Sequence, residues 1–423
     1  MPRHRHALTA AATALVLSVS SAGCADSHEG PVTLRLVAAD YEVGGQSDST
    51  EQYWDALITA FEAAHPGIKV EVEVVSWDSV DRKVAGMVEE GEAPDLAQIG
   101  AYADYAKRGE LYAAESLLSV RVQANFLRPF STAGEQGTEQ YGMPFAASTR
   151  LLFYNEELFA KAGVAQPPRT WDELKSVAHR LKSRTGVRYP MAVPLGPEEA
   201  QMETMAWMLG GGGGYTSPSG SYAISSEENV DSLDWLKANL VKEGLTGPVS
   251  PEQLNRKEAY AAFLRGEVGM VNGFPSLLQD AQKAGIKVGT VAVPGRDAKT
   301  PPAPGVVDWI MAFKRNGHPE ELGTFLNFVF SDENVREFAT RNNLLPVTMS
   351  VTGQMRAAER YRDLWKFLDE LPASQLPPVN KTSWTLVSAS TKRNIGSAMT
   401  PGGSPAKALR QIADDAKKAE SGR

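Results

Sequence analysis

The sequence contains one cysteine, Cys24, in 423 residues, so no disulfide can form within the chain. It has no block of basic residues, and its net charge is −8, which argues against electrostatic binding of nucleic acid. After the first 24 residues, no apolar run reaches the length that a membrane-spanning helix needs. These absences leave an ordinary globular chain whose length favours two or three domains.

Common catalytic and metal-binding motifs are also absent. The six histidines form no HExxH pattern and no pair four residues apart, so a histidine zinc site is not indicated. Neither GxSxG nor Gly-Lys-Ser/Thr occurs, and the glycine run at 210–214 fails the GxGxxG pattern at Tyr215. These absences argue against an enzyme, and we expect no cofactor and no metal ion.

The N-terminal segment has the composition of an export signal. MPRHRH is basic, ALTAAATALVLSV is apolar but too short to span a bilayer, and SSAGC follows. Ala22 and Gly23 match a lipobox, whereas Ser21 stands where leucine is usual. We expect a signal over 1–23, lipidation of Cys24, a tether over 24–31 and anchoring to the outer face of the cell membrane. The alternative is ordinary cleavage nearby, which would leave a free thiol.

Apolar periodicity beyond the tether predicts an α/β fold. Strands are expected at 33–40, 68–77 and 94–100, with helices at 50–67 and 78–91 between them. This βαβαβ order predicts a parallel sheet with helices on both faces, and ligands gather beyond the carboxyl ends of such strands. A second alternation of strands and helices, from about 167 to 295, predicts a second α/β lobe.

The segment 141–164, YGMPFAASTRLLFYNEELFAKAGV, is unusual because Ser148, Thr149 and Arg150 interrupt an apolar run. Two interpretations are open at this point. The three side chains could line a ligand site, or they could form a bulge at a sheet edge and face solvent. The strand at 306–315 is interrupted in a similar way by Asp308 and Trp309.

The longer stretch YGMPFAASTRLLFYNEELFAKAGVAQPPRTWDEL resembles the family-one extracellular solute-binding proteins of ATP-binding-cassette importers, which include sugar-binding lipoproteins. Four further blocks fit this family in the same order: FEAAHPGIKVEVEVVSW, APDLAQIG, AYAAFLRGEVGMVNG and SDENVREFA. Together the five blocks span most of residues 31–415.

The resemblance implies a two-lobed, periplasmic-binding-protein-like fold of type II, with a ligand cleft between lobes joined by crossing hinge segments. Lobe 1 is expected to comprise 32–145 plus about 310–345, and lobe 2 to comprise 146–309 plus about 346–423. The crossings are expected near 145–150, at 309–313 and near 345–346. In this arrangement Ser148, Thr149 and Arg150 would line the cleft.

A sugar site needs aromatic platforms and polar groups that bind the hydroxyls. On this basis the expected ligand contacts are Asp40, Tyr41, Glu42, Tyr102, Ser148, Thr149, Arg150, Glu198, Asn272, Phe274, Asp308, Trp309 and Trp384. Trp309 is the strongest aromatic candidate because it lies beside Asp308 at an expected crossing. Its replacement by alanine should abolish the response to ligand and leave the unliganded melting transition unchanged.

The expected function is capture of a sugar or oligosaccharide outside the membrane by a monomer, which delivers it to a membrane permease by lobe closure. A glycerophosphate or amino-sugar derivative remains an alternative ligand, with Arg150 and Arg393 as the available cations for an anion. An exported glycan-acting enzyme, or a surface lipoprotein that engages another protein, are alternatives of a different class.

Overall fold

The computed structural model describes residues 31–41 and 49–422. The expected signal segment, Cys24 and Glu42 lie outside the described residues. Within the described ranges, no helix combines the length and the apolar character that crossing a bilayer requires.

The first sheet has five strands in the order β2-β1-β3-β11-β6. The strands β1 (Val32–Asp40), β2 (Ile68–Ser76) and β3 (Leu96–Ile99) confirm the expected βαβαβ unit, and β1 pairs in parallel with both others. The helices α1 (Ser49–Ala64) and α2 (Val80–Glu89) connect them. The strand β11 (Gly305–Ala312) lies between β3 and β6 (Met143–Thr149) and is antiparallel to both, so the sheet as a whole is mixed.

Helices pack around this sheet and bury its apolar side chains. In α1, Trp54, Leu57 and Phe61 are buried on one face, as the sequence spacing predicts. The remaining helices of this half are α3 (Ala103–Lys107), α4 (Val120–Asn125), α5 (Arg128–Ala133), α12 (Pro319–Val329), α13 (Asp332–Arg341), α14 (Met349–Ala357) and α15 (Trp365–Glu370). A short hairpin, β4 (Glu135–Gln136) and β5 (Glu139–Gln140), leads into β6.

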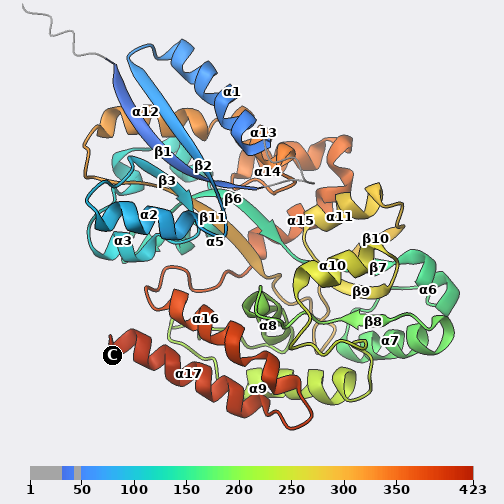
Figure 1. Ribbon diagram of the computed structural model, residues 1–423. Helices are drawn as coiled ribbons and strands as arrows, with labels where there is room; N and C mark the ends of the chain where they lie inside the picture. The colour runs from blue at the N-terminus through green and yellow to red at the C-terminus, as the bar shows by residue number, and fades with distance from the viewer. Residues whose placement is uncertain (1–30, 42–48, 423) are drawn as a thin grey trace, which may run out of the picture.

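The second sheet has four strands in the order β10-β7-β9-β8. They are β7 (Leu151–Asn155), β8 (Tyr189–Ala192), β9 (Val268–Gly273) and β10 (Val288–Val291). Its helices are α6 (Glu156–Ala162), α7 (Trp171–Thr185), α8 (Ala200–Gly210), α9 (Glu227–Leu236), α10 (Arg256–Leu264), α11 (Pro275–Lys283), α16 (Trp384–Asn394) and α17 (Pro405–Ser421). Figure 1 shows α16 and α17 beside α8 and α9, below the first sheet.

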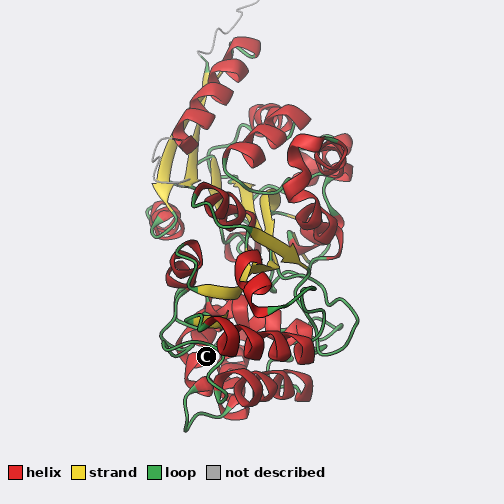
Figure 2. Cartoon of the chain, turned by 90° about the vertical axis from the view of Figure 1, so that its right-hand side faces the viewer, coloured by secondary structure: helices red, strands yellow, loops and turns green. Residues whose placement is uncertain are grey.

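The chain passes three times between the two sheets, which lie in separate halves of the molecule (Figure 2). The first passage is the single residue Arg150, between the end of β6 and the start of β7. The second passage is the segment 292–304 between β10 and β11. The third is the proline-rich segment 374–383, between a 3₁₀ turn at Leu371–Ala373 and α16.

These passages differ in detail from the expected crossings. Residues 146–149 and 305–309 were expected in lobe 2, but strand pairing places them in the first sheet. The segment near Leu345 was expected to cross, but Leu345 forms an antiparallel bridge with Ala147 beside β6. The chain then continues through α14 and α15, and α15 also packs near β6. Asn343 and Asp363 already contact α11 of the second half, through Gln279 and Gln282, and the chain crosses to α16 after residue 373.

Candidate functional site between the two sheets

Strand directions bring the predicted residues of the first sheet to one edge. The carboxyl ends of β1 and β3 point the same way because the strands are parallel. The end of β6 and the start of β11 lie at this same edge, since β11 runs antiparallel to both β3 and β6. Asp40, Tyr41, Ser148 and Asp308 therefore gather at the edge from which the chain leaves for the second sheet.

The second sheet presents a matching edge. The start of β7 pairs with the end of β9, because Leu151 lies opposite Gly273. The strand β8 is parallel to β9, so the segment after β8 that contains Glu198 begins at this edge as well. Arg150, Glu198, Asn272 and Phe274 thus gather where the chain enters from the first sheet, and the two edges face each other across the crossings.

At the first edge, Tyr41 and Asp308 form a short hydrogen-bonded chain. The Tyr41 hydroxyl donates to Asp308 Oδ2 at 2.7 Å and accepts from Gln98 Nε2 at 2.9 Å. Gln98 Oε1 in turn accepts from the backbone N–H of Ala39 at 3.0 Å, so the group is tied to β1 and β3. Burial raises the pKa of Asp308 to about 7, although the hydrogen bond from Tyr41 opposes this shift.

At the second edge, Arg150 lies inside a network of buried ion pairs. Its guanidinium is 3.0 Å from Glu203 and 3.1 Å from Glu199, and only 1% of its side chain is exposed. The Glu203 Oε1 atom also accepts from Trp207 Nε1 and Asn272 Nδ2, each at 3.0 Å. Burial raises the pKa of Glu203, and the positive charge of Arg150 opposes that rise.

A second arginine extends this network toward the surface. Arg256 Nε is 2.5 Å from Glu199 and Arg256 Nη2 is 2.8 Å from Glu198, so Glu198 lies in the network as an ion-pair partner. The guanidinium carbons of Arg150 and Arg256 are 4.6 and 5.9 Å from the centre of the Phe274 ring, within the range of cation–π attraction. The Phe274 ring, which is half-buried, is therefore bordered by two cations.

Ser148 and Thr149, which precede Arg150 at the crossing, are also buried rather than open to a ligand. Ser148 is 8% exposed, Thr149 is fully buried, and Thr149 Oγ1 donates to the Pro304 carbonyl at 3.2 Å. The interpretation of a solvent-facing bulge is wrong for these side chains, since the whole of β6 is buried although it is the edge strand. The register shifts where Asp308 and Trp309 pair with Ala146 and Pro144, so the extra residue, Phe145, lies in β6 itself.

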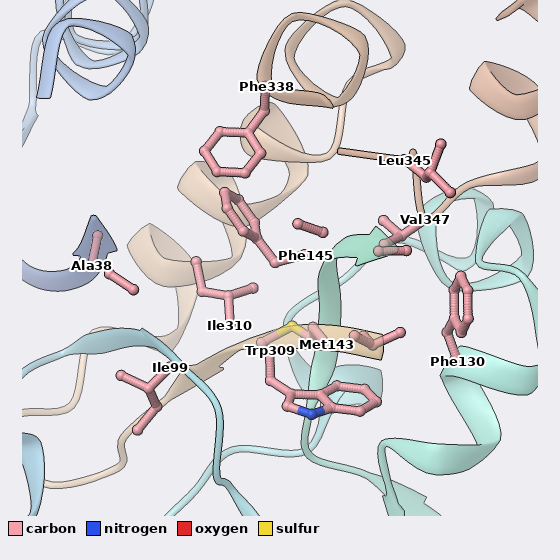
Figure 3. Packing of buried hydrophobic residues seen from close by; sticks show 14 of the residues in the cluster. Ala38, Ile99, Phe130, Met143, Phe145, Trp309, Ile310, Phe338, Leu345 and Val347 are labelled. Atoms are coloured by element: carbon pink, nitrogen blue, oxygen red, sulfur yellow. The ribbon is translucent and has the colours of Figure 1, made fainter. Parts of the chain in front are cut away.

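Trp309 and Tyr102 belong to the core below the first edge. Trp309 has no exposed surface, and its ring centre is 5.2 Å from that of Tyr102, which is also fully buried. Figure 3 shows the indole among Met143, Ile310 and other apolar side chains. The Tyr102 hydroxyl donates to the Ala133 carbonyl at 2.5 Å. The expectation of a Trp309 ring facing a ligand does not agree with this burial.

The other predicted aromatic, Trp384, lies at the first residue of α16. It is half-buried, and its ring meets that of Tyr215 edge-on at 4.8 Å. Arg393, the second cation considered for an anionic ligand, is exposed at the far end of the same helix. At 1.5 Å per residue, about 13 Å of helix separates it from Trp384. The structure therefore keeps Arg393 away from the start of α16.

A groove of about 1070 Å³ opens beside the third passage and is lined by both halves of the molecule. Its walls come from α3 and α5 on one side, the loop at 216–220 on the other, and the segment 372–383 between them. Its polar lining residues include Lys107, Arg128, Thr132, Gln136, Thr216, Ser217, Gln375, Asn380, Lys381 and Glu420. This volume is at the upper end of the range for small-molecule sites, and it is large enough for an oligosaccharide.

Sequence reasoning missed the residues that line this groove and the partners of Arg150. No local pattern links the proline-rich segment 374–383 to Lys107 or Arg128. Glu203 carried one available signal, because it is the only charged residue of the apolar helix α8, whose N-cap is Glu199. Among the described residues, no three histidine, cysteine, aspartate or glutamate side chains form a group able to hold a metal ion.

Known proteins resemble this chain over nearly its whole length. A Brucella abortus (strain 2308) protein named only as a binding protein is 27% identical over 396 residues, covering 93% of each chain. The cyclic alpha-maltosyl-1,6-maltose binding protein of Arthrobacter globiformis superposes with a TM-score of 0.78 at 17% identity, covering 93% of this chain and 100% of that one.

A second solved structure agrees with the first. A solute-binding protein of an ABC transporter from Thermotoga lettingae, bound with alpha-D-tagatose, gives a TM-score of 0.75 at 21% identity, covering 92% of this chain and 100% of that one. These likenesses confirm the expected two-lobed fold of type II. The family model described as "Bacterial extracellular solute-binding protein" matches residues 46–336. This chain therefore belongs to the family of bacterial extracellular solute-binding proteins.

Proposed function

We propose that this protein captures a sugar or oligosaccharide outside the cell and delivers it to the permease of an ABC importer. The observation that supports this most directly is the pair of sheet edges, joined by three passages of the chain, with a groove beside the third passage that both halves line. The polar groups and half-buried rings at these edges suit the hydroxyls and the apolar faces of a sugar.

Two relatives with named ligands represent the two candidate ligand classes. A diacetylchitobiose binding protein of Streptomyces coelicolor is 26% identical over 148 residues, which is 34% of each chain. The sn-glycerol-3-phosphate-binding protein of Shigella dysenteriae is 26% identical over 224 residues, or 48% of each chain. Neither arginine considered for an anionic ligand is placed to bind one, because Arg150 is already paired with Glu199 and Glu203 and Arg393 lies at the far end of α16.

Delivery follows from linkage between binding and closure. A sugar that contacts both lobes binds the closed form more tightly, so it shifts the population toward that form. The closed form then docks on the permease, and the chain itself carries out no hydrolysis. We place the lobes at about 32–149 plus 305–373 and about 151–304 plus 374–423, which moves the expected boundaries to follow the strand pairing.

The proposed ligand contacts are the half-buried members of the predicted set, Asp40, Tyr41, Glu198, Phe274, Asp308 and Trp384. Asn272 is proposed to support them from the second edge. We further propose that residues 1–23 are removed, that a lipid on Cys24 holds the protein at the outer face of the membrane, and that the protein acts as a monomer.

A thermal-shift screen tests the function. The panel contains maltose, maltotriose, tagatose, diacetylchitobiose and sn-glycerol 3-phosphate, with chromatography of each mixture after incubation. We expect at least one uncharged sugar to raise the melting temperature and to be recovered intact. The size of the increase should depend on the ratio of the free sugar concentration to its Kd. A response to glycerol phosphate alone would contradict the sugar class, and recovery of cleaved sugar would contradict a pure binding role.

A further inference from the structure

Arg150 is buried and so does not face a ligand, but its position between the two sheets suggests another role. It is the single residue between β6 of the first sheet and β7 of the second, so it lies at a passage about which the lobes would close. Its side chain extends into the second half, where it contacts Glu199 and Glu203 near the start of α8. The passage is therefore attached through this side chain to the second lobe.

The same network holds Phe274 from several sides. Arg150 and Arg256 border its ring at 4.6 and 5.9 Å. The Phe274 backbone N–H donates to the Tyr260 hydroxyl at 3.1 Å, and that hydroxyl donates to the Asn272 carbonyl at 3.4 Å. The Asn272 side chain is bound to Glu203, so the end of β9 is fixed through both its backbone and its side chains.

Burying these charges costs free energy, which a purely apolar packing would avoid. Arginine suits this position better than lysine, because its planar fork reaches two carboxylates at once while its face lies against an aromatic ring. We propose that Arg150 is a positioning residue, which ties the Phe274 ring and the Asn272 amide to the hinge so that they keep one orientation at the ligand-facing edge of the second lobe. This role replaces the direct ligand contact expected from the sequence.

The first test needs no ligand. The full chain is prepared with 4-fluorophenylalanine at Phe274 alone, and its ¹⁹F resonance is recorded in the native background, in Arg150→Lys and in Arg150→Met/Glu203→Gln. The double variant removes the buried charge pair but keeps an oxygen that accepts from Trp207 and Asn272. In both variants we expect the resonance to shift and broaden, because the ring loses the guanidinium that lies over it.

A matched probe and a matched variant make this result specific. The same label at Phe263, which is fully buried in α10, should keep its resonance in all three proteins. Arg188→Lys removes a guanidinium that lies 5.4 Å from the Tyr189 ring in the same lobe, and it should leave the Phe274 signal unchanged. An unaltered Phe274 resonance in both Arg150 variants would overturn the proposal, and so would equal changes at Phe274 and Phe263.

The second test concerns binding and rests on the proposed function. With maltotriose as the probe, Arg150→Lys should weaken affinity by about 2- to 30-fold, which is the range that cation–π geometry accounts for. In the Phe274→Ala background, the same substitution should change affinity no further. Multiplicative losses would mean that Arg150 acts by another route and would refute the proposal.

The two tests fail independently. If the native chain binds neither maltotriose nor any other sugar of the panel, the sugar class is wrong, while the fluorine signal still decides the role of Arg150. If sugars bind and the fluorine signal is unaffected by both variants, the proposed function stands and the positioning role is wrong.

Discussion

Trp309→Ala is the substitution for which the structure and the sequence pattern predict opposite results. The sequence pattern places the indole against a ligand, so the unliganded protein should tolerate its loss. In the structure the side chain is fully buried within the core of the first half (Figure 3), and its ring packs against that of Tyr102. Truncation of a buried tryptophan to alanine typically costs about 3–5 kcal/mol, through lost contacts and the cavity left behind.

The walls around the indole favour the upper part of that range. A methyl group at Gly142 would lie 2.9 Å from the indole Cε3 atom, and one at Gly134 would lie 3.1 Å from Cζ3. The ring thus lies against bare backbone at two positions, and backbone closes a cavity less readily than side chains do. We therefore expect Trp309→Ala to lower the free energy of unfolding by about 4 kcal/mol.

Trp309→Phe separates packing from hydrogen bonding. The indole Nε1 atom is buried and has no hydrogen-bond partner among the described residues, a defect that costs about 1–3 kcal/mol in the native state. Phenylalanine keeps one aromatic ring in the site and removes this unpaired donor. Its cost should therefore be less than half that of the alanine variant.

Urea unfolding followed by circular dichroism measures these differences. With a slope of about 3 kcal/mol per molar urea, a loss of 4 kcal/mol lowers the midpoint by about 1.3 M. Trp384→Ala is the matched control, because that ring is half-buried at the start of a helix and should shift the midpoint by much less. A Trp309→Ala protein with the native midpoint but no response to sugar would refute this reasoning and return the indole to the ligand site.

Three further predictions follow from other features. Burial raises the pKa of Asp308 to about 7, from about 3.9 in an unfolded chain. Between about pH 4 and pH 7 the native state therefore binds a proton that the unfolded state has lost, so the free energy of unfolding falls as the pH rises through this window. Asp308→Asn should remove that part of the slope of urea midpoint against pH, and an identical slope would contradict it. Phe274→Ala should weaken sugar binding about tenfold or more, with only a small change in the melting temperature without ligand, since the ring is half-buried. Titration and scanning calorimetry measure these two quantities, and a variant that binds sugar as tightly as the native protein would count against this contact. Cys24→Ser should move the protein from the membrane fraction to the soluble fraction with loss of acyl mass, and retention at the membrane would exclude lipid anchoring through this residue.

Much of the fold was predictable because short-range signals agree with the tertiary structure. The alternation of Val-rich segments and amphipathic helices gave β1, α1, β2, α2 and β3 in the correct order. Thr170 caps α7, because its hydroxyl accepts from the Glu173 N–H at 3.2 Å, and a threonine three residues before a glutamate is a local signal for such a cap. The lobe boundaries were harder to predict from the sequence, because they depend on which distant strands pair with β6 and β11.

The interpretation of Asp308 and Trp309 failed for a reason visible in strand geometry. Successive side chains of a strand point to opposite faces of the sheet, so two neighbours rarely serve the same site. Asp308 bonds to Tyr41, whereas Trp309 packs against Tyr102. A polar residue beside an aromatic one in a strand therefore predicts one side chain at the site and one in the core, and burial decides which is which.

Arg150 shows the limit of assigning a role to one residue at a time. Its sequence neighbours are Thr149 and Leu151, but its partners Glu203 and Phe274 lie 53 and 124 positions away. A lone arginine between two strands predicts exposure to a ligand, since an unpaired buried charge is prohibitively costly. Because two carboxylates and an aromatic ring surround Arg150 in the structure, its charge is paired inside the protein and the residue positions its neighbours instead of binding the ligand. The chemistry of the hinge therefore depends on α8 and β9 as much as on the crossing strand, and a substitution in α8 such as Glu203→Gln should alter the ligand-facing edge without touching the ligand.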